Sequence, residues 1–242
     1  MHNRDLWVDY ARGIGIFLVV AGHVSRGVFN AGIEMNTELF KLTDSIIYSF
    51  HMPLFFFLSG LFVLPSFEKY GRNGLIAEKI NSVFYPYVVW SLLQGLIEVA
   101  LSRFTTAKTS IPEVLAFLWQ PRAQFWFLYV LLLIFVIAAV LLRPHSKKYN
   151  GLFPLLAIPA WLAQIFFKLP FPLDFIANYA IFFFLGMRFN EIKHIFQQKS
   201  LLLTLVGLGS FLIFQYQFHI RLGLFYADKS LLTLPLALSG IL

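Results

Sequence analysis

The sequence predicts an all-α membrane protein, a polytopic bundle of transmembrane helices. Of its 242 residues, 59% are hydrophobic, 29 are phenylalanine and only 13% are charged, whereas a soluble domain carries about 25% charged residues. Several apolar runs also reach the roughly 20 residues that a helix needs to cross the hydrocarbon core. The net charge of +7 fits lysines and arginines in cytoplasmic loops facing anionic lipid, so we expect a lipid bilayer and no nucleic acid as a partner.

The apolar runs predict seven spans and a partial eighth. The expected spans cover residues 6–28, 45–67, 83–101, 123–142, 149–167, 173–189 and 200–220, with the partial one at 230–242. The fourth, fifth and seventh contain no Asp, Glu, Lys or Arg, whereas the first holds Arg12 and His23 and the third holds Glu98. Because the last apolar run stops at Leu242, we expect one membrane domain over residues 1–242 that is truncated at its C-terminus.

Positive charge in alternate loops predicts the orientation. Ten lysines and arginines fall on the side of the N-terminus and eight on the other side, and the cluster at 143–148 belongs to the first set. The positive-inside rule therefore favours a cytoplasmic N-terminus in the cell (inner) membrane. On this topology Arg12 lies near the cytoplasmic surface, while His23 and His51 lie in the outer half of the bilayer.

Arg12 and His23 are the first candidate site residues. Eleven residues make three helical turns plus roughly 20°, so both side chains project from one face, about 16 Å apart along the axis. An ionisable side chain at this depth is costly unless water or a partner solvates it, and is therefore a candidate functional group. A neutral imidazole can act as a general base toward a hydroxyl. The alternatives are a helix–helix hydrogen bond for His23 and an interfacial anchor for Arg12.

His51 is the second candidate, in the string FHMPLFFFLSG. Pro53 interrupts helical hydrogen bonding there, and the small pair Ser59-Gly60 indicates close helix packing. Because His51 and His23 are expected at matched depth, we predict that their rings lie within about 10 Å and face one cavity. The alternative is that His51 caps the second helix at the interface. We expect no metal site, because the six histidines are scattered and cysteine is absent.

Five ordered motifs resemble the acyltransferase family 3 of integral-membrane O-acyltransferases, in particular its fucose-4-O-acetylase-like branch. They are WVDYARGIGIFLVVAGH, FHMPLFFFLSG, EKINSVFYPYVVW, FWFLYVLL and FFFLGMRF. Proteins of this family have more spans than this chain provides. The resemblance implies transfer of an acyl group, usually acetyl from cytoplasmic acetyl-CoA, to a hydroxyl of a cell-envelope glycan or a small acceptor.

The resemblance also implies residue roles. Arg12 and His23 match the family's required Arg-x10-His pair, with His23 as general base or transient acyl carrier and His51 near the acceptor. Arg12, with Lys79 and Arg72, would hold the anionic phosphates of acyl-CoA. Where the family often has Arg-x-x-Arg, this chain has Lys79 and Ser82, and a lysine lacks the bidentate fork of arginine.

Two alternatives belong to other classes. The first is a transporter or flippase whose charged path includes the same residues, which internal repeats would favour. The second is an inactive, truncated paralogue.

Overall fold

The computed structural model describes residues 6–104, 109–198 and 200–241, and every regular element in these ranges is helical. The predicted all-α class is therefore confirmed for the described chain. The helices form two compact units, Met1–Phe62 with Gly151–Leu242, and Val63–Asn150. The predicted single domain stays a prediction.

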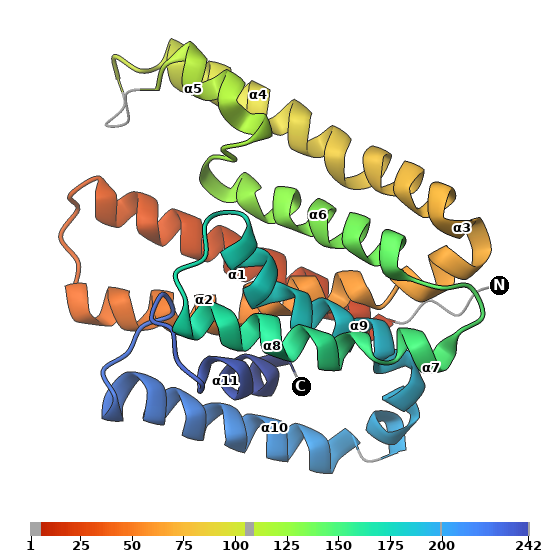
Figure 1. Cartoon of the computed structure of the whole chain (residues 1–242). Coiled ribbons are helices and arrows are strands. Elements are labelled where there is room, and N and C mark those ends of the chain that lie inside the picture. Colours follow the sequence, from red (N-terminus) through yellow and green to blue (C-terminus); the bar gives the residue numbers. More distant parts are fainter. Residues whose placement is uncertain (1–5, 105–108, 199, 242) are drawn as a thin grey trace. The chain divides into compact units, whose positions relative to one another are not determined.

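The first unit is organised around one central helix, α2. This helix packs against α1, α9 and α11, while α8 packs on α9 and α10 packs on α11. Figure 1 shows α1 and α2 as antiparallel neighbours joined by the loop at 31–36. The helices of this unit are α1 (Leu6–Asn30), α2 (Thr37–Gly60), α8 (Phe153–Phe166), α9 (Leu173–Gln198), α10 (Ser200–Gln215), the π-helical turn η4 (Tyr216–Arg221) and α11 (Thr233–Ile241).

Small residues set the contact between α1 and α2. The buried positions of α1 are Val8, Gly15 and Gly22, and their seven-residue interval places them in one stripe. A Cβ on Gly15 would lie 2.8 Å from the ring of Phe55, and one on Gly22 would lie 3.2 Å from the ring of Tyr48. The stripe is therefore the face of α1 that packs on α2.

Glycine sets the contact between α2 and α9 as well. A Cβ on Gly60 would lie 2.0 Å from the carbonyl oxygen of Phe183, and one on Gly186 would lie 2.0 Å from the carbonyl oxygen of Phe57. Asn190 adds a hydrogen bond, its Nδ2 donating to the Leu61 carbonyl at 3.0 Å. The close packing predicted for Ser59-Gly60 is thus confirmed at Gly60.

Helix ends differ from the predicted spans where polar residues extend a helix. α2 begins at Thr37 rather than at residue 45, because the Asn36 side chain accepts a hydrogen bond from the Leu39 N–H at 2.9 Å and caps the first turn. α9 continues past Arg188 to Gln198. Hydropathy detects only the apolar part of a helix, whereas backbone hydrogen bonding and capping decide where it ends.

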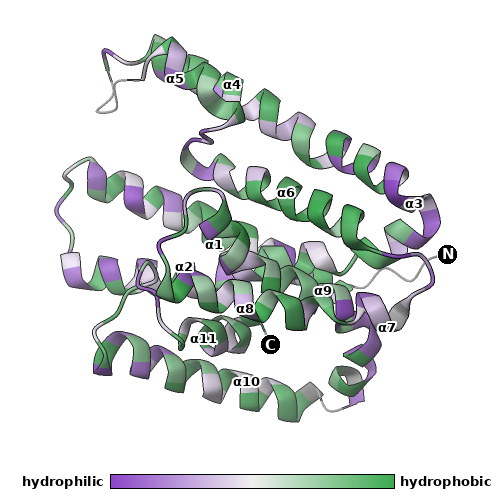
Figure 2. Cartoon of the chain, in the orientation of Figure 1, coloured by the Kyte–Doolittle hydropathy of each residue, from purple (hydrophilic) through white to green (hydrophobic). Residues whose placement is uncertain are grey.

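The second unit pairs α3 with α6 and α4 with α5. Gly71 interrupts α3 with φ of +66°, a conformation open chiefly to glycine, so the chain turns immediately before Arg72. Figure 2 shows apolar colour along almost all of α6. The elements are α3 (Val63–Lys79), the π-helical turn η1 (Ile80–Phe84), α4 (Tyr85–Ala100), α5 (Ile111–Leu115), η2 (Ala116–Leu118), η3 (Ala123–Phe125), α6 (Trp126–Leu141) and α7 (Lys147–Asn150).

Within the residues that the structure describes, four helical stretches are long and apolar enough to cross a membrane: Leu6–Asn30, Val63–Ala100, Ile111–Leu141 and Leu201–Arg221. The predicted count of seven spans and a partial eighth stays a prediction. Large apolar side chains remain exposed along these helices, and those of α10 are more than half exposed at Leu201, Leu202, Leu205, Leu212 and Ile213. Such a surface is suited to lipid rather than to water.

Candidate functional site

Arg12 and His23 lie on one unbroken helix and are both exposed. At 3.6 residues per turn, the two side chains project from the same flank of α1, within about 100° of the stripe of Val8, Gly15 and Gly22. The Arg12 guanidinium stands over the ring of Phe62, with Cζ 5.0 Å from its centroid. The flank next to the packed stripe therefore presents a cation and an imidazole that a ligand can reach.

Arg26, near the C-terminal end of α1, and Asp44, in the second turn of α2, join the two helices. The guanidinium donates from Nε to Oδ1 and from Nη2 to Oδ2, both at 2.8 Å. The same guanidinium covers the Tyr48 ring at 3.6 Å and approaches the Tyr226 ring at 5.3 Å. A bidentate ion pair that also stacks on tyrosine fixes the geometry of this end of the two helices.

The sequence did not single out Arg26 or Asp44. Arg26 follows His23 by three residues, a spacing that puts both on adjoining parts of one helix face. That spacing was the available signal for Arg26. The pairing with Asp44 depends on how α1 packs on α2 and has no local signature.

His51 is buried, with 1% of its surface exposed. Its Nδ1 lies 2.7 Å from the Ile47 carbonyl oxygen. A carbonyl only accepts hydrogen bonds, so Nδ1 carries the proton and the lone pair of the neutral ring is on Nε2. The ring meets Tyr48 edge to face, with centroids 4.4 Å apart.

Tyr48 links His51 to Arg26, because its ring contacts both side chains. We call His23, Arg26, Asp44, Tyr48 and His51 the Arg26 cluster. His23 is included because it lies about one helical turn before Arg26 on α1. The predicted separation of about 10 Å between the two histidine rings stays a prediction.

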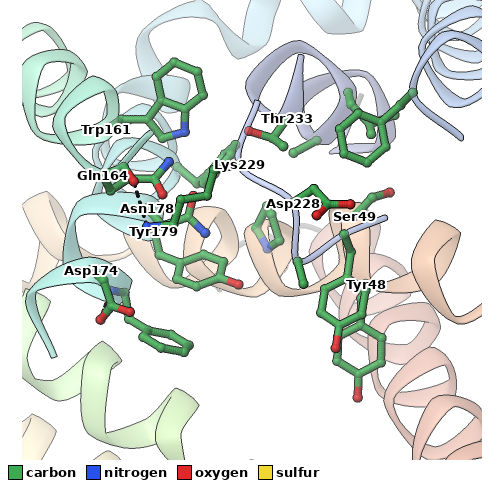
Figure 3. Close-up of a pocket in the computed structure, with 18 residues that line it drawn as sticks. Tyr48, Ser49, Trp161, Gln164, Asp174, Asn178, Tyr179, Asp228, Lys229 and Thr233 are labelled. Atoms are coloured by element: carbon green, nitrogen blue, oxygen red, sulfur yellow. Dashed lines mark hydrogen bonds between the residues drawn. The ribbon is translucent and has the colours of Figure 1, made fainter. Parts of the chain in front are cut away.

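A cavity of about 280 Å³ lies in the first unit beside the Arg26 cluster. Tyr48 and Tyr226 line it and also contact Arg26, and the Tyr226 N–H donates to Ser45 Oγ at 2.7 Å. Neither His23 nor His51 lines this cavity, so it is not a cavity that both rings face. Figure 3 shows the polar lining, with Tyr48, Ser49, Gln164, Asp174, Asn178, Tyr179, Asp228, Lys229 and Thr233 around the space.

Arg72, a predicted donor-binding residue of the second unit, holds the end of α6. Its Nε donates to the Ala139 carbonyl at 2.8 Å and its Nη2 to the Val140 carbonyl at 3.1 Å. The last carbonyls of a helix have no partner within the helix. Arg72, on α3, supplies a hydrogen-bond donor to two of these carbonyls, those of Ala139 and Val140. This residue therefore has a structural role.

Lys79 and Ser82 lie where α3 passes into the π-helical turn η1. Lys79 pairs with Glu78 at 2.9 Å and stands 4.5 Å from the Phe135 ring centroid, while Ser82 Oγ donates to the Glu78 carbonyl at 2.8 Å. The Lys79 ammonium is thus already beside a carboxylate. A phosphate would have to compete with Glu78 for it, so these residues fit a CoA phosphate only in part.

Among the described residues, no group of three or more His, Asp or Glu side chains is arranged to hold a metal ion.

Comparison with known proteins identifies the class. A family model described as an acyltransferase domain matches residues 5–242, and the chain belongs to this acyltransferase family, as the motifs predicted. With its apolar helices, the chain is a multi-pass membrane protein. No solved structure matches it.

Two curated relatives carry the name Nodulation protein NolL. The one from Sinorhizobium fredii is 31% identical over 139 residues, which is 56% of this chain and 36% of the relative. The one from Mesorhizobium japonicum is 28% identical over 142 residues, 58% of this chain and 36% of the relative. The chain thus matches little more than a third of the length of these relatives.

Proposed function

We propose that this chain belongs to a membrane-bound O-acyltransferase of the cell membrane. It would move an acyl group, acetyl in the simplest case, from cytoplasmic acyl-CoA to a hydroxyl of a cell-envelope glycan or a small acceptor. The observation that carries this proposal is the exposed pair of Arg12 and His23 on one flank of α1, in a chain that belongs to an acyltransferase family.

The separation of Arg12 and His23 fits the shape of an acyl-CoA. This substrate is elongated, with phosphates at one end and the thioester at the other. A cation and a base about 16 Å apart along one helix can serve those two ends. With a cytoplasmic N-terminus, Arg12 lies on the side of the acyl-CoA pool.

His23 acts in this proposal as the general base. Its imidazole takes the proton of the acceptor hydroxyl while the oxygen attacks the thioester carbonyl. The new C–O bond forms, the C–S bond breaks, and the departing thiolate receives the proton from the imidazolium. In the alternative route, the imidazole itself attacks first and carries the acyl group to the hydroxyl.

The remaining members of the Arg26 cluster position this base. Arg26 and Asp44 tie the turn after His23 to α2 through two hydrogen bonds. His51 is held by the Ile47 carbonyl with Nε2 as its acceptor. If the two rings lie at the predicted matched depth, this second imidazole would orient the hydroxyl or share its proton.

The test measures acetyl transfer in membranes that contain the chain, with radiolabelled acetyl-CoA and a set of envelope acceptors. His23→Ala should lose about 10²- to 10⁴-fold in rate, the usual contribution of a general base, with unchanged insertion and yield. His194→Ala is the matched control, because His194 is an exposed histidine on α9. Retention of more than half the activity in His23→Ala, or no transfer by the unmodified chain, would refute the proposal.

A further inference from the structure

An apolar groove of about 270 Å³ lies in the second unit, along the contact between α3, the turn η1 and α6. We call it the α3–α6 groove, and Figure 1 shows the two helices side by side. The stretch from Leu75 to Phe84 covers about 13 Å at 1.5 Å per residue, enough for a segment of an extended hydrocarbon chain. The lining residues that the structure describes are Lys79 and seven apolar ones: Leu75, Ile76, Ile80, Phe84, Leu132, Phe135 and Val136.

The α3–α6 groove is open on one side. Ile80 and Val136 line it and are 47% and 39% exposed, whereas Leu75 and Phe135 are buried and form its floor. Both walls belong to helical stretches that are long and apolar enough to cross a membrane. An open apolar surface on such helices is suited to hydrocarbon rather than to water, so the groove fits an acyl chain of a lipid.

Lys79 and Glu78 place a charged pair beside this apolar surface. The Lys79 Nζ donates to Glu78 Oε1 at 2.9 Å, which uses one of the three N–H donors of the ammonium. The other carboxylate oxygen, Glu78 Oε2, is buried and accepts no hydrogen bond from the described residues. Buried polar atoms in folded proteins are almost always paired. Glu78 Oε2 therefore requires a donor, while Lys79 can still donate to a further acceptor.

The pair discriminates between headgroups by charge. An anionic headgroup that approaches Lys79 is repelled by the carboxylate of Glu78, which is already bonded to the ammonium. A headgroup that is only cationic is repelled by Lys79 for the same reason. A zwitterion avoids both penalties, because its ammonium can donate to Glu78 Oε2 while its phosphate accepts from Lys79. Charge complementarity thus favours a headgroup that carries a phosphate and an ammonium with free N–H donors.

We infer that the α3–α6 groove is a lipid site that selects a phospholipid with a primary-amine headgroup, a phosphatidylethanolamine. One acyl chain lies on the apolar residues of the groove, the phosphate accepts from Lys79, and the ammonium donates to Glu78 Oε2. A choline headgroup carries the same charges but has no N–H to donate, so it leaves the buried oxygen of Glu78 unpaired. The inference is independent of the proposed acyl transfer, because it concerns binding of a bilayer lipid to the second unit.

Lipid titrations followed by native mass spectrometry test this inference on the purified, delipidated full chain in detergent. The probes share dioleoyl chains and differ only in the headgroup: phosphatidylethanolamine, its N,N-dimethyl derivative, phosphatidylcholine and phosphatidylglycerol. Phosphatidylethanolamine should bind about five- to tenfold more tightly than phosphatidylcholine and phosphatidylglycerol, as expected for one partly exposed, charge-assisted hydrogen bond. The dimethyl derivative should lie in between, because methylation removes N–H donors and leaves the charge unchanged.

Two variants locate the site. Glu78→Gln removes the carboxylate charge, and the preference for phosphatidylethanolamine over phosphatidylcholine should fall below about twofold. Glu191→Gln is the matched control, because both glutamates are ion-paired and both side chains are 42% exposed. Val136→Trp fills the groove and should weaken all four phospholipids about tenfold. Val140→Trp is its control, because Val140 is exposed on the same helix and is not among the residues of the groove.

Several results would overturn the inference. Equal affinity for phosphatidylethanolamine and phosphatidylcholine would remove the role of the headgroup N–H, and tightest binding of phosphatidylglycerol would show an anion site instead. A preference that survives in Glu78→Gln, or undiminished binding in Val136→Trp, would place the lipid elsewhere on the chain. The methylated headgroups need no substitution in the protein, so that comparison decides even where a variant does not fold.

Discussion

Gly60→Ala tests the packing that holds α2 against α9. The added Cβ would lie 2.0 Å from the Phe183 carbonyl oxygen and 3.0 Å from the Met187 nitrogen. Ordinary contact begins at 3.4 Å, so the two backbones must separate by about 1.4 Å. Both obstacles are backbone atoms of α9, which cannot rotate away as a side chain can.

The expected loss of stability is at or above the upper end of the roughly 1–3 kcal/mol typical of overpacked sites. Separation of the helices by more than 1 Å also forfeits a large part of the dispersion energy along their contact. The assay is thermal unfolding of the detergent-solubilised chain, followed by size-exclusion chromatography of the fraction that remains monodisperse.

Gly209→Ala is the matched control, because Gly209 lies within α10 and its Cβ would meet nothing within 4 Å. At this position alanine should raise the free energy of unfolding by about 1 kcal/mol through its higher helix propensity alone. Opposite signs for the two substitutions are therefore expected. A Gly60→Ala variant as stable as the unmodified chain would refute the packing argument.

Two further predictions concern charged residues. Arg12→Ala should weaken acyl-CoA binding in calorimetry, and Arg12→Lys should recover the affinity only in part because lysine lacks the bidentate fork. Lys79→Ala should reduce the affinity for acyl-CoA less than Arg12→Ala does. An unchanged affinity in Arg12→Ala would leave Arg12 as an interfacial anchor. Asp44→Asn should lower both the melting temperature and the transfer rate, the latter about tenfold or more, because it leaves the half-buried Arg26 without its charge partner. Glu191→Gln, at an ion pair within one helix, is its control, and equal effects of the two would contradict the role given to Asp44.

The sequence by itself determined the features that depend on composition and on the period of one helix. The share of charged residues fixed the membrane class, and the described chain is helical. The common flank of Arg12 and His23 follows from eleven residues of continuous α1, because helical periodicity is local. Motifs of the same local kind also predicted the family, which the family model confirms over residues 5–242.

Only the tertiary structure decided which distant residues meet. Arg26 and Asp44 are 18 positions apart and pair because α1 packs on α2 through a stripe of small residues. The cavity takes side chains from positions 48 to 237. Such contacts depend on the packing of whole helices, and no short window of sequence encodes the register between two helix surfaces. The sequence predicted His23 and His51 at matched depth, whereas the contacts of Tyr48 with His51 and with Arg26 came from the fold.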